Sequence, residues 1–135
     1  MTDCLTIALA QLNPCVGDLV ANAGLVRAAR AEAAKQGADL LMTSELVISG
    51  YPPEDLVLKG SFQEAVRKTI EGLALETDDG GPGLLISAPW LENSKLFNAA
   101  LLLDKGRIQA VIPKHDLPNY SVFDEKRIFT AGPRP

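Results

Sequence analysis

Residues 38–56, ADLLMTSELVISGYPPEDL, decide the interpretation of the fold because they join an apolar run to an acidic turn. The run ADLLMTSE has the length and composition of a buried β-strand, and it ends on Glu45. The turn Gly-Tyr-Pro-Pro then delivers Glu54 and Asp55. Buried strands seldom end on an unpaired carboxylate, since moving such a charge out of water is costly. We therefore expect another part of the chain to supply a partner for Glu45.

Strand and helix patterns alternate before this stretch. Residues 5–12, LTIALAQL, predict a buried strand that stops at an Asn-Pro turn. A helix is predicted over residues 19–36, with Asp18 as its N-cap and Gly37 as its stop. A strand, this helix and the strand at 38–45 favour a parallel crossover connection.

The same alternation continues after it. A second helix is predicted over residues 61–76, with Ser61 as its cap and an apolar stripe on one side. The stripe consists of Phe62, Val66, Ile70 and Leu73. Further strands are predicted at 83–90, 97–103 and 107–112, the last two joined by a hairpin turn, and a long loop is predicted at 116–135. The sequence therefore predicts an α/β fold, with helices covering a sheet.

Composition limits the classes of function. The 135 residues are 47% hydrophobic, which is enough to bury a core, and their formal charge is −4. No basic stripe favours nucleic acid, and no apolar run reaches the roughly 20 residues of a membrane helix. No basic leader precedes Asp3, so we expect a cytoplasmic protein. Cys4, Cys15 and the single His115 lack metal-site spacing, so we expect no structural metal. A disulfide is compatible with the sequence, but a cytosolic setting favours free thiols.

Two ionisable residues stand where strands end. Glu45 ends the second predicted strand, and Lys114 ends the last one, in VIPKHD. An α/β sheet opens its ligand crevice at the carboxyl ends of its strands, so these side chains are expected to face each other. A structural ion pair and a catalytic pair both satisfy this placement.

Four segments resemble a known family: AQLNPCVGD, ADLLMTSELVISGYPPEDL, FNAALLLDKGRIQAVIPK and KHDLPNYSVFDEKRIFTAG. Together, from residue 5 to 132, they resemble the nitrilase-type glutaminase domain of glutamine-dependent NAD synthetases. GYPPEDL combined with LPNYSVFDEKR is similar to this branch in particular. The resemblance implies a four-layer αββα sandwich, of which residues 1–135 are expected to be the N-terminal portion.

The family releases ammonia from glutamine with a Glu-Lys-Cys triad, through a covalent thioester. By resemblance, Glu45 matches the general base, Lys114 the triad lysine and Glu125 a second glutamate near the lysine. Tyr51 and Tyr120 match positions that line the glutamine pocket. These types suit the chemistry, because a thiol needs a base to become nucleophilic and a cation stabilises the oxyanion. The triad cysteine is expected after residue 135, so the 135 residues alone are expected to be inactive.

The resemblance also implies properties of a larger enzyme. A second, synthetase domain would use ATP and Mg²⁺ to amidate deamido-NAD, while the present segment would act on glutamine and hold no cofactor. Self-association into a homo-oligomer is expected on the same basis.

Competing interpretations stay open at this point. Tyr51 has an alternative role as a packing residue with a satisfied hydroxyl, and Glu125 as a solvated member of the charge run DEKR. The family usually has proline where Ser44 stands, a departure that affects only the local backbone. Alternative functions are another nitrilase-type amidase and a non-catalytic interaction module with the same fold.

Overall fold

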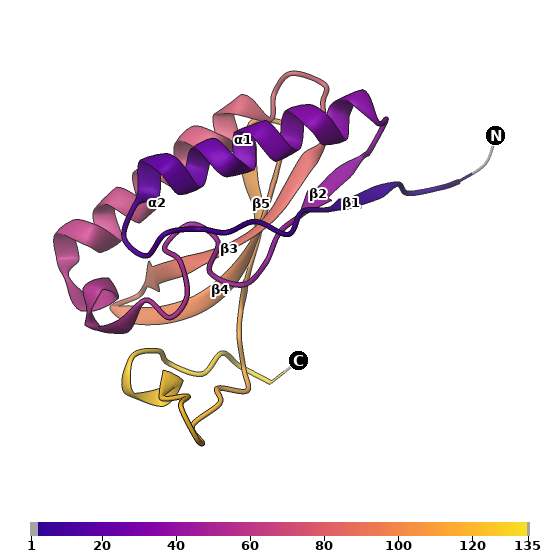
Figure 1. Ribbon diagram of the computed structural model, residues 1–135. Helices are drawn as coiled ribbons and strands as arrows, with labels where there is room; N and C mark the ends of the chain where they lie inside the picture. The colour runs from indigo at the N-terminus through magenta and orange to yellow at the C-terminus, as the bar shows by residue number, and fades with distance from the viewer. Residues whose placement is uncertain (1–2, 135) are drawn as a thin grey trace.

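The computed structural model describes residues 3–134 and shows one sheet covered on one face by two helices (Figure 1). The strands lie in the order β1-β2-β3-β4-β5, with the first three parallel and the last two continuing the sheet antiparallel. The α/β prediction and the parallel crossover are confirmed. The elements are β1 (Ile7–Leu9), α1 (Leu19–Lys35), β2 (Leu40–Met42), the 3₁₀ helix η1 (Glu54–Leu58), α2 (Gly60–Glu76), β3 (Gly83–Glu92), β4 (Lys95–Asp104), β5 (Arg107–Pro113) and the 3₁₀ helix η2 (Glu125–Arg127).

The first two strands are shorter than the sequence predicts. β1 covers 3 residues rather than 5–12, and the expectation that it is buried is wrong, since Leu5 is 66% and Leu9 74% exposed. Successive side chains of a strand point to opposite faces of the sheet, and Leu9 is on the face away from the helices. Its apolar character alone therefore did not predict its exposure. β2 ends at Met42, and Glu45 lies in the turn that follows instead of ending the strand.

The two helices begin in different ways. α1 starts as predicted, because Asp18 Oδ1 accepts the backbone N–H of Ala21 at 3.0 Å. α2 starts at Gly60, and the predicted Ser61 cap is wrong. The extended residue Lys59 occupies the cap position, and its backbone carbonyl accepts the first hydrogen bonds of the helix. A backbone acceptor of this kind leaves no signature in the sequence.

β3, β4 and β5 form two successive hairpins. The first turn consists of Asn93 and Ser94, whose φ angles of 49° and 62° are the positive values that a type I′ turn requires. This hairpin is not predicted from the sequence, and β4 begins at Lys95 rather than at the predicted residue 97, because Asn-Ser lacks the glycine that usually marks such turns. The second turn, at Lys105 and Gly106, lies where it was predicted.

The main core lies between the helices and the sheet. The predicted stripe of α2 faces it, with Val66, Ile70 and Leu73 buried. The helix-facing residues of β3 and β4 complete this core: Leu84, Ile86, Ala88, Ala99, Leu101 and Leu103. A smaller core joins Leu46, Val57, Leu96, Leu117 and Phe129. This second cluster holds residues 116–134 of the long predicted loop against the body of the domain.

The opposite face of the sheet carries no further layer within residues 3–134 (Figure 1). Leu85 pairs with Leu102 at positions that alternate with the core residues, and Ile112 on β5 is 58% exposed. The described residues therefore form one helix layer and one sheet layer, which is half of the expected αββα arrangement.

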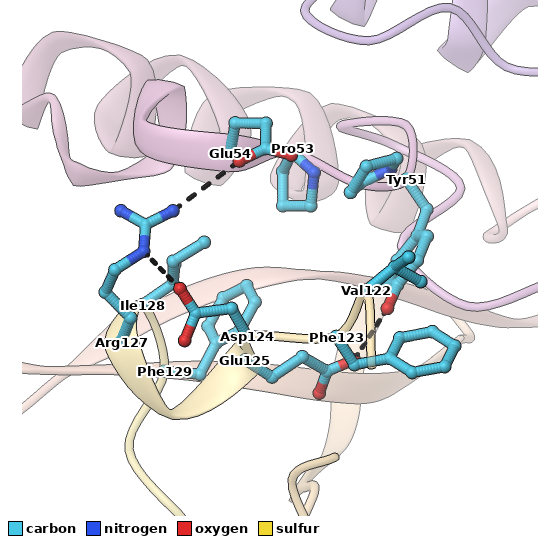
Figure 2. A pocket seen from close by; sticks show the side chains of 11 residues that line it. Tyr51, Pro53, Glu54, Val122, Phe123, Asp124, Glu125, Arg127, Ile128 and Phe129 are labelled. Atoms are coloured by element: carbon cyan, nitrogen blue, oxygen red, sulfur yellow. Dashed lines mark hydrogen bonds and ion pairs between the residues drawn. The ribbon is translucent and has the colours of Figure 1, made fainter. Parts of the chain in front are cut away.

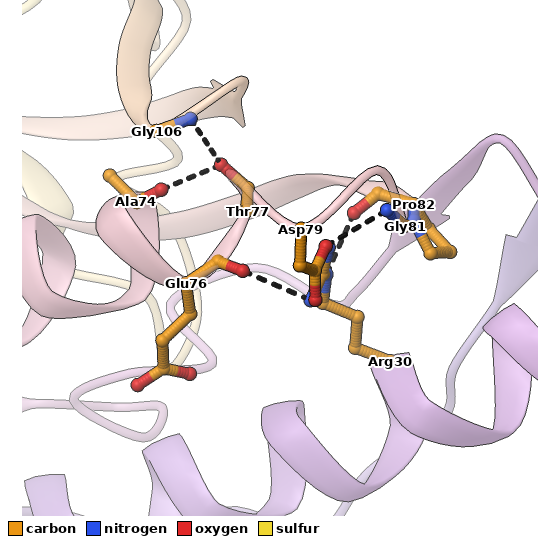
Figure 3. A network of polar contacts seen from close by, with 8 residues as sticks. All are labelled: Arg30, Ala74, Glu76, Thr77, Asp79, Gly81, Pro82 and Gly106. Carbon is orange, nitrogen blue, oxygen red and sulfur yellow. Dashed lines mark hydrogen bonds and ion pairs between the residues drawn. The ribbon is translucent and has the colours of Figure 1, made fainter.

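A polar network closes the end of the sheet where β3 begins (Figure 3). Arg30 of α1 donates to the Pro82 carbonyl at 2.7 Å and makes two bonds to the Asp79 carboxylate, at 2.6 and 2.9 Å. The hydrogen bond from Arg30 holds the pKa of Asp79 well below its usual range. Thr77, which is 2% exposed, accepts the backbone N–H of Gly106 at 3.0 Å. This network joins α1, the loop after α2 and the β4–β5 turn.

Among residues 3–134, no helix is both long and apolar enough to cross a membrane.

Replacing Asp18 with alanine should lower the free energy of unfolding by about 1 kcal/mol, because the N–H of Ala21 loses its acceptor. Ser61→Ala is the matched control and should stay within about 0.5 kcal/mol of the wild type, since Ser61 is not the cap of α2. Urea denaturation of both variants measures the difference. Equal losses would contradict the assignment of the two caps.

The isolated 135-residue chain should self-associate through the open sheet face, since a contiguous apolar surface favours contact with another copy. Ile112→Lys should shift the chain toward monomer in sedimentation and reduce the binding of a hydrophobic dye. Val20→Lys is the control, because Val20 is also exposed, at 83%, but lies on α1. A strictly monomeric, dye-silent wild-type chain would rule this expectation out.

Candidate active site

A turn after β2, rather than the strand itself, places Glu45. Residues 45–49 form this turn, in which Leu46 has a φ of 52°. Asn22 of α1, fully buried, holds it by donating to the Ile48 carbonyl at 2.9 Å. The turn ends at Gly50, where a Cβ would lie 2.7 Å from the Cα of Val16, so only glycine fits this close backbone approach. Glu45 is thus carried beyond β2 on a fixed support.

Glu45 and Lys114 face each other as predicted. Lys114 Nζ lies 2.6 Å from Glu45 Oε1, and their side chains are 30% and 44% exposed. The Lys114 backbone is fixed on both sides, because its N–H donates to the Asn98 carbonyl at 2.7 Å and its carbonyl accepts from Gly132 at 2.8 Å. The pair is partly open to solvent, which weakens a purely structural explanation of it.

Glu125 joins this pair from the C-terminal loop. Its side chain is 6% exposed, and Lys114 Nζ lies 3.3 Å from Oε1 and 3.1 Å from Oε2. Only the contact to Oε1 has hydrogen-bond geometry, so the approach to Oε2 is electrostatic. The alternative of Glu125 as a solvated member of the DEKR run is therefore wrong. One ammonium group lies between two carboxylates.

Tyr51 completes the cluster. Its hydroxyl donates to Glu125 Oε1 at 3.1 Å, as Figure 2 shows. Removal of this hydroxyl from water and its bond to Glu125 raise the pKa of Tyr51 to about 12. For Lys114, burial lowers the pKa, but the hydrogen bonds to Glu45 and Glu125 outweigh it and the net shift is upward. Lys114 is consequently a cation, and Tyr51 a neutral donor, at physiological pH.

The structure does not bring Tyr120 to this cluster. Tyr120 is 69% exposed and packs edge-to-face on Phe123, with ring centroids 5.6 Å apart. His115, directly after the lysine, donates from Nδ1 to the Gly132 carbonyl at 2.6 Å. Cys4 and Cys15 are free thiols. Both are exposed.

Sequence reasoning missed Asn98 and Ser87. Asn98, 2% exposed, donates from Nδ2 to Glu45 Oε1 at 2.6 Å. The Ser87 hydroxyl lies 3.4 Å from Asn98 Oδ1. Asn98 could have been identified as the one side-chain amide inside the apolar strand FNAALLL, since a buried polar side chain needs a hydrogen-bond partner.

Two hollows flank the cluster. The first, of 360 Å³, has Tyr51 and Glu125 on one side and Glu54, Asp124 and Arg127 on the other (Figure 2). Arg127 pairs with Asp124 at 2.7 Å and Glu54 at 3.5 Å, and so ties η2 to η1. The second, of 410 Å³, lies on the open sheet face and contains the Glu45–Lys114 pair. A substrate in either hollow would contact the charged cluster.

The arrangement supports acid–base chemistry. Within residues 3–134, no group of three or more His, Cys, Asp or Glu side chains is placed to hold a metal ion. Glu45 offers a partly exposed carboxylate for proton transfer, and the Lys114 ammonium offers a fixed positive charge for a developing oxyanion.

Comparison with known proteins shows which family the chain belongs to. Residues 6–134 match the family described as Carbon-nitrogen hydrolase. This chain belongs to the carbon-nitrogen hydrolase family. Among its relatives, the glutamine-dependent NAD(+) synthetase of Rhodobacter capsulatus is 43% identical over 98% of this chain and 24% of its own length. The synthetase of Thermotoga maritima is 40% identical over 95% of this chain and 22% of its own length. This carbon-nitrogen hydrolase chain thus spans about a quarter of the length of these relatives, corresponding to their N-terminal part.

Solved structures place the fold in the same family. The glutamine-dependent NAD+ synthetase of Acinetobacter baumannii, in complex with ADP, superposes with a TM-score of 0.90 at 32% identity, over 96% of this chain and 24% of that one. An amidase from Nesterenkonia sp. gives a TM-score of 0.81 at 32% identity, over 97% of this chain and 49% of that one. The nitrilase-type fold of this carbon-nitrogen hydrolase is therefore confirmed.

Tyr51 should ionise only near pH 12, well above the ordinary value of about 10 for tyrosine, because its hydroxyl is shielded and bonded to Glu125. A raised pKa favours the protonated form in the folded state. The stability that it contributes is full below pH 10 and is lost as pH rises through 12. Tyrosinate absorbance of the wild type minus that of Tyr51→Phe isolates this group. A difference curve with its midpoint near pH 10 would contradict the Tyr51–Glu125 bond.

Proposed function

We propose that this chain is the N-terminal part of the glutaminase domain of a glutamine-dependent NAD synthetase. The cluster of Glu45, Lys114 and Glu125 carries the proposal, since it supplies a base and a fixed cation at one place. The similarity to NAD synthetases over 98% of the chain supports glutamine as the substrate class. One structure of the Nesterenkonia amidase carries acrylamide on its active-site cysteine, which supports a thiol as nucleophile.

Glu45 acts as the base in this proposal. A cysteine thiol from beyond residue 135 gives its proton to the Glu45 carboxylate, and the sulfur forms a bond to the amide carbon of glutamine. Glu45 returns the proton to the amide nitrogen as the carbon–nitrogen bond breaks, which releases ammonia and leaves a thioester. Glu45 next takes a proton from water, and the water oxygen attacks the thioester carbon. The carbon–sulfur bond then breaks, which releases glutamate, and the departing sulfur recovers the proton from Glu45.

Lys114 and Glu125 have separate tasks. The Lys114 ammonium is the proposed stabiliser of the oxygen that becomes negative in each tetrahedral intermediate, an interaction typically worth about 3 kcal/mol per donor. Glu125, buried and bonded to Tyr51, holds Lys114 in place and keeps it charged. Tyr51 borders the 360 Å³ hollow and is the proposed pocket residue. Tyr120 remains a proposed pocket residue by family resemblance alone.

The rest of the synthetase reaction belongs to a domain outside these 135 residues. ATP and Mg²⁺ are proposed to act there in the amidation of deamido-NAD with the released ammonia, in the cytoplasm and in a homo-oligomer. A second candidate is an amidase of the nitrilase type, favoured by the TM-score of 0.81 with the Nesterenkonia enzyme. Measuring which amide the full-length protein hydrolyses separates the two. Hydrolysis of no amide would favour the non-catalytic module.

Glu45→Gln in the full-length protein should lower the rate of glutamine-driven NAD synthesis at least roughly 100- to 10,000-fold, which is what a positioned base contributes. Glutamine keeps the size and hydrogen-bonding reach of the side chain but takes up no proton. Ammonium supplied from solution bypasses the glutaminase step, so ammonia-driven synthesis should persist.

Lys114→Met should give the same separation between the two nitrogen sources, because it removes the charge that stabilises the oxyanion. The assay compares NAD formed from glutamine with NAD formed from ammonium for each variant. Equal loss of both activities in a folded Glu45→Gln protein would show that the glutamate is structural.

A further inference from the structure

Asn98 is a buried polar side chain that the proposed mechanism does not use. It lies in β4 among apolar neighbours and is 2% exposed. Its side-chain amide donates to Glu45, and its backbone carbonyl accepts the N–H of Lys114 at 2.7 Å. One residue of the sheet therefore contacts both members of the charged pair.

The two donors to Glu45 reach the same oxygen. Asn98 Nδ2 and Lys114 Nζ each lie 2.6 Å from Oε1. No hydrogen bond from residues 3–134 reaches Oε2. A carboxylate oxygen that accepts two hydrogen bonds, one of them from a cation, is a poor site for a proton. Proton transfer is thereby directed to Oε2.

We propose that Asn98 is a positioning residue of the glutaminase site, which fixes the Glu45 carboxylate so that Oε1 is held and Oε2 exchanges the proton. This rests on the proposed function. Asn98 suits the task because β4 is a central strand and the Ser87 hydroxyl on β3 approaches its Oδ1 at 3.4 Å, which leaves Nδ2 directed at Glu45. The side chain of Lys114 is long and flexible, so Lys114 supplies charge but fixes the Glu45 carboxylate less firmly than Asn98 does.

Loss of the Asn98 donor should leave Glu45 held by Lys114 alone. Among residues 3–134, the ionisable groups around Glu45 are Lys114 directly and, beyond it, Glu125 and Tyr51, and none of them is hydrogen-bonded to the Asn98 side chain. With one donor fewer, the carboxylate would rotate more freely, and Oε2 would be presented to the thiol less often. The chemical step should therefore slow.

The test is the steady-state kinetics of ammonia release from glutamine in the full-length protein. Asn98→Ala should lower kcat about tenfold while KM changes little, within what a hydrogen bond to a charged group contributes. Asn98→Asp keeps the shape of the side chain but places a second carboxylate against Oε1, so kcat should fall further. Ammonia-driven synthesis should be retained in both variants.

Thr77→Val is the matched control. It also removes a buried polar side chain, but at the opposite end of the sheet, and should lower stability without lowering kcat for glutamine. An unchanged kcat in both Asn98 variants, or equal loss of glutamine- and ammonia-driven synthesis, would overturn the role of Asn98 while leaving the glutaminase function intact. A wild-type protein that releases no ammonia from glutamine would overturn the proposed function and, with it, this inference.

Discussion

The arrangement of the site depends on the ammonium group of Lys114. It lies 2.6 Å from Glu45 and 3.1 Å from Glu125, and so joins the turn after β2, the end of β5 and the C-terminal loop. Without it, two carboxylates would face each other, one of them almost fully buried. Their repulsion would oppose the packing of η2 against the body of the domain. The positive charge that suits an oxyanion is also the charge that holds the site together.

The meeting of Glu45 and Lys114 could be predicted from the sequence, although not for the full reason. The strand-end rule put both residues at one edge of the sheet. β3 and β4 lie between β2 and β5, however, so two side chains at the ends of β2 and β5 would be too far apart to meet. The turn at residues 45–49 crosses this distance. Its Ile48 N–H donates to the Ser87 carbonyl of β3 at 3.4 Å, and Glu45 thereby reaches Asn98 of β4.

The burial of Glu125 and its bond to Tyr51 could not be predicted from local pattern. The two residues are 74 positions apart, and the run DEKR has the composition of a solvated surface. Burial arises because Leu117 and Phe129, on either side of η2, pack into the second core and fold the segment over the sheet edge. Only the family resemblance singled out Glu125. The α1 cap, by contrast, was predictable because aspartate acts there through its own side chain.

The mixed pairing of the sheet has a consequence for how the site assembles in time. β3, β4 and β5 are joined by two-residue turns, so their pairing closes short loops at low entropic cost. The pairing of β2 with β3 waits for a crossover that spans η1 and α2, and such non-local contacts form more slowly. Asn98 and Lys114 therefore belong to the part of the chain that pairs early, and Glu45 to a part that docks later. Substitutions in the β3–β5 hairpins should act mainly on the folding rate, whereas those in the turn after β2 should act mainly on unfolding.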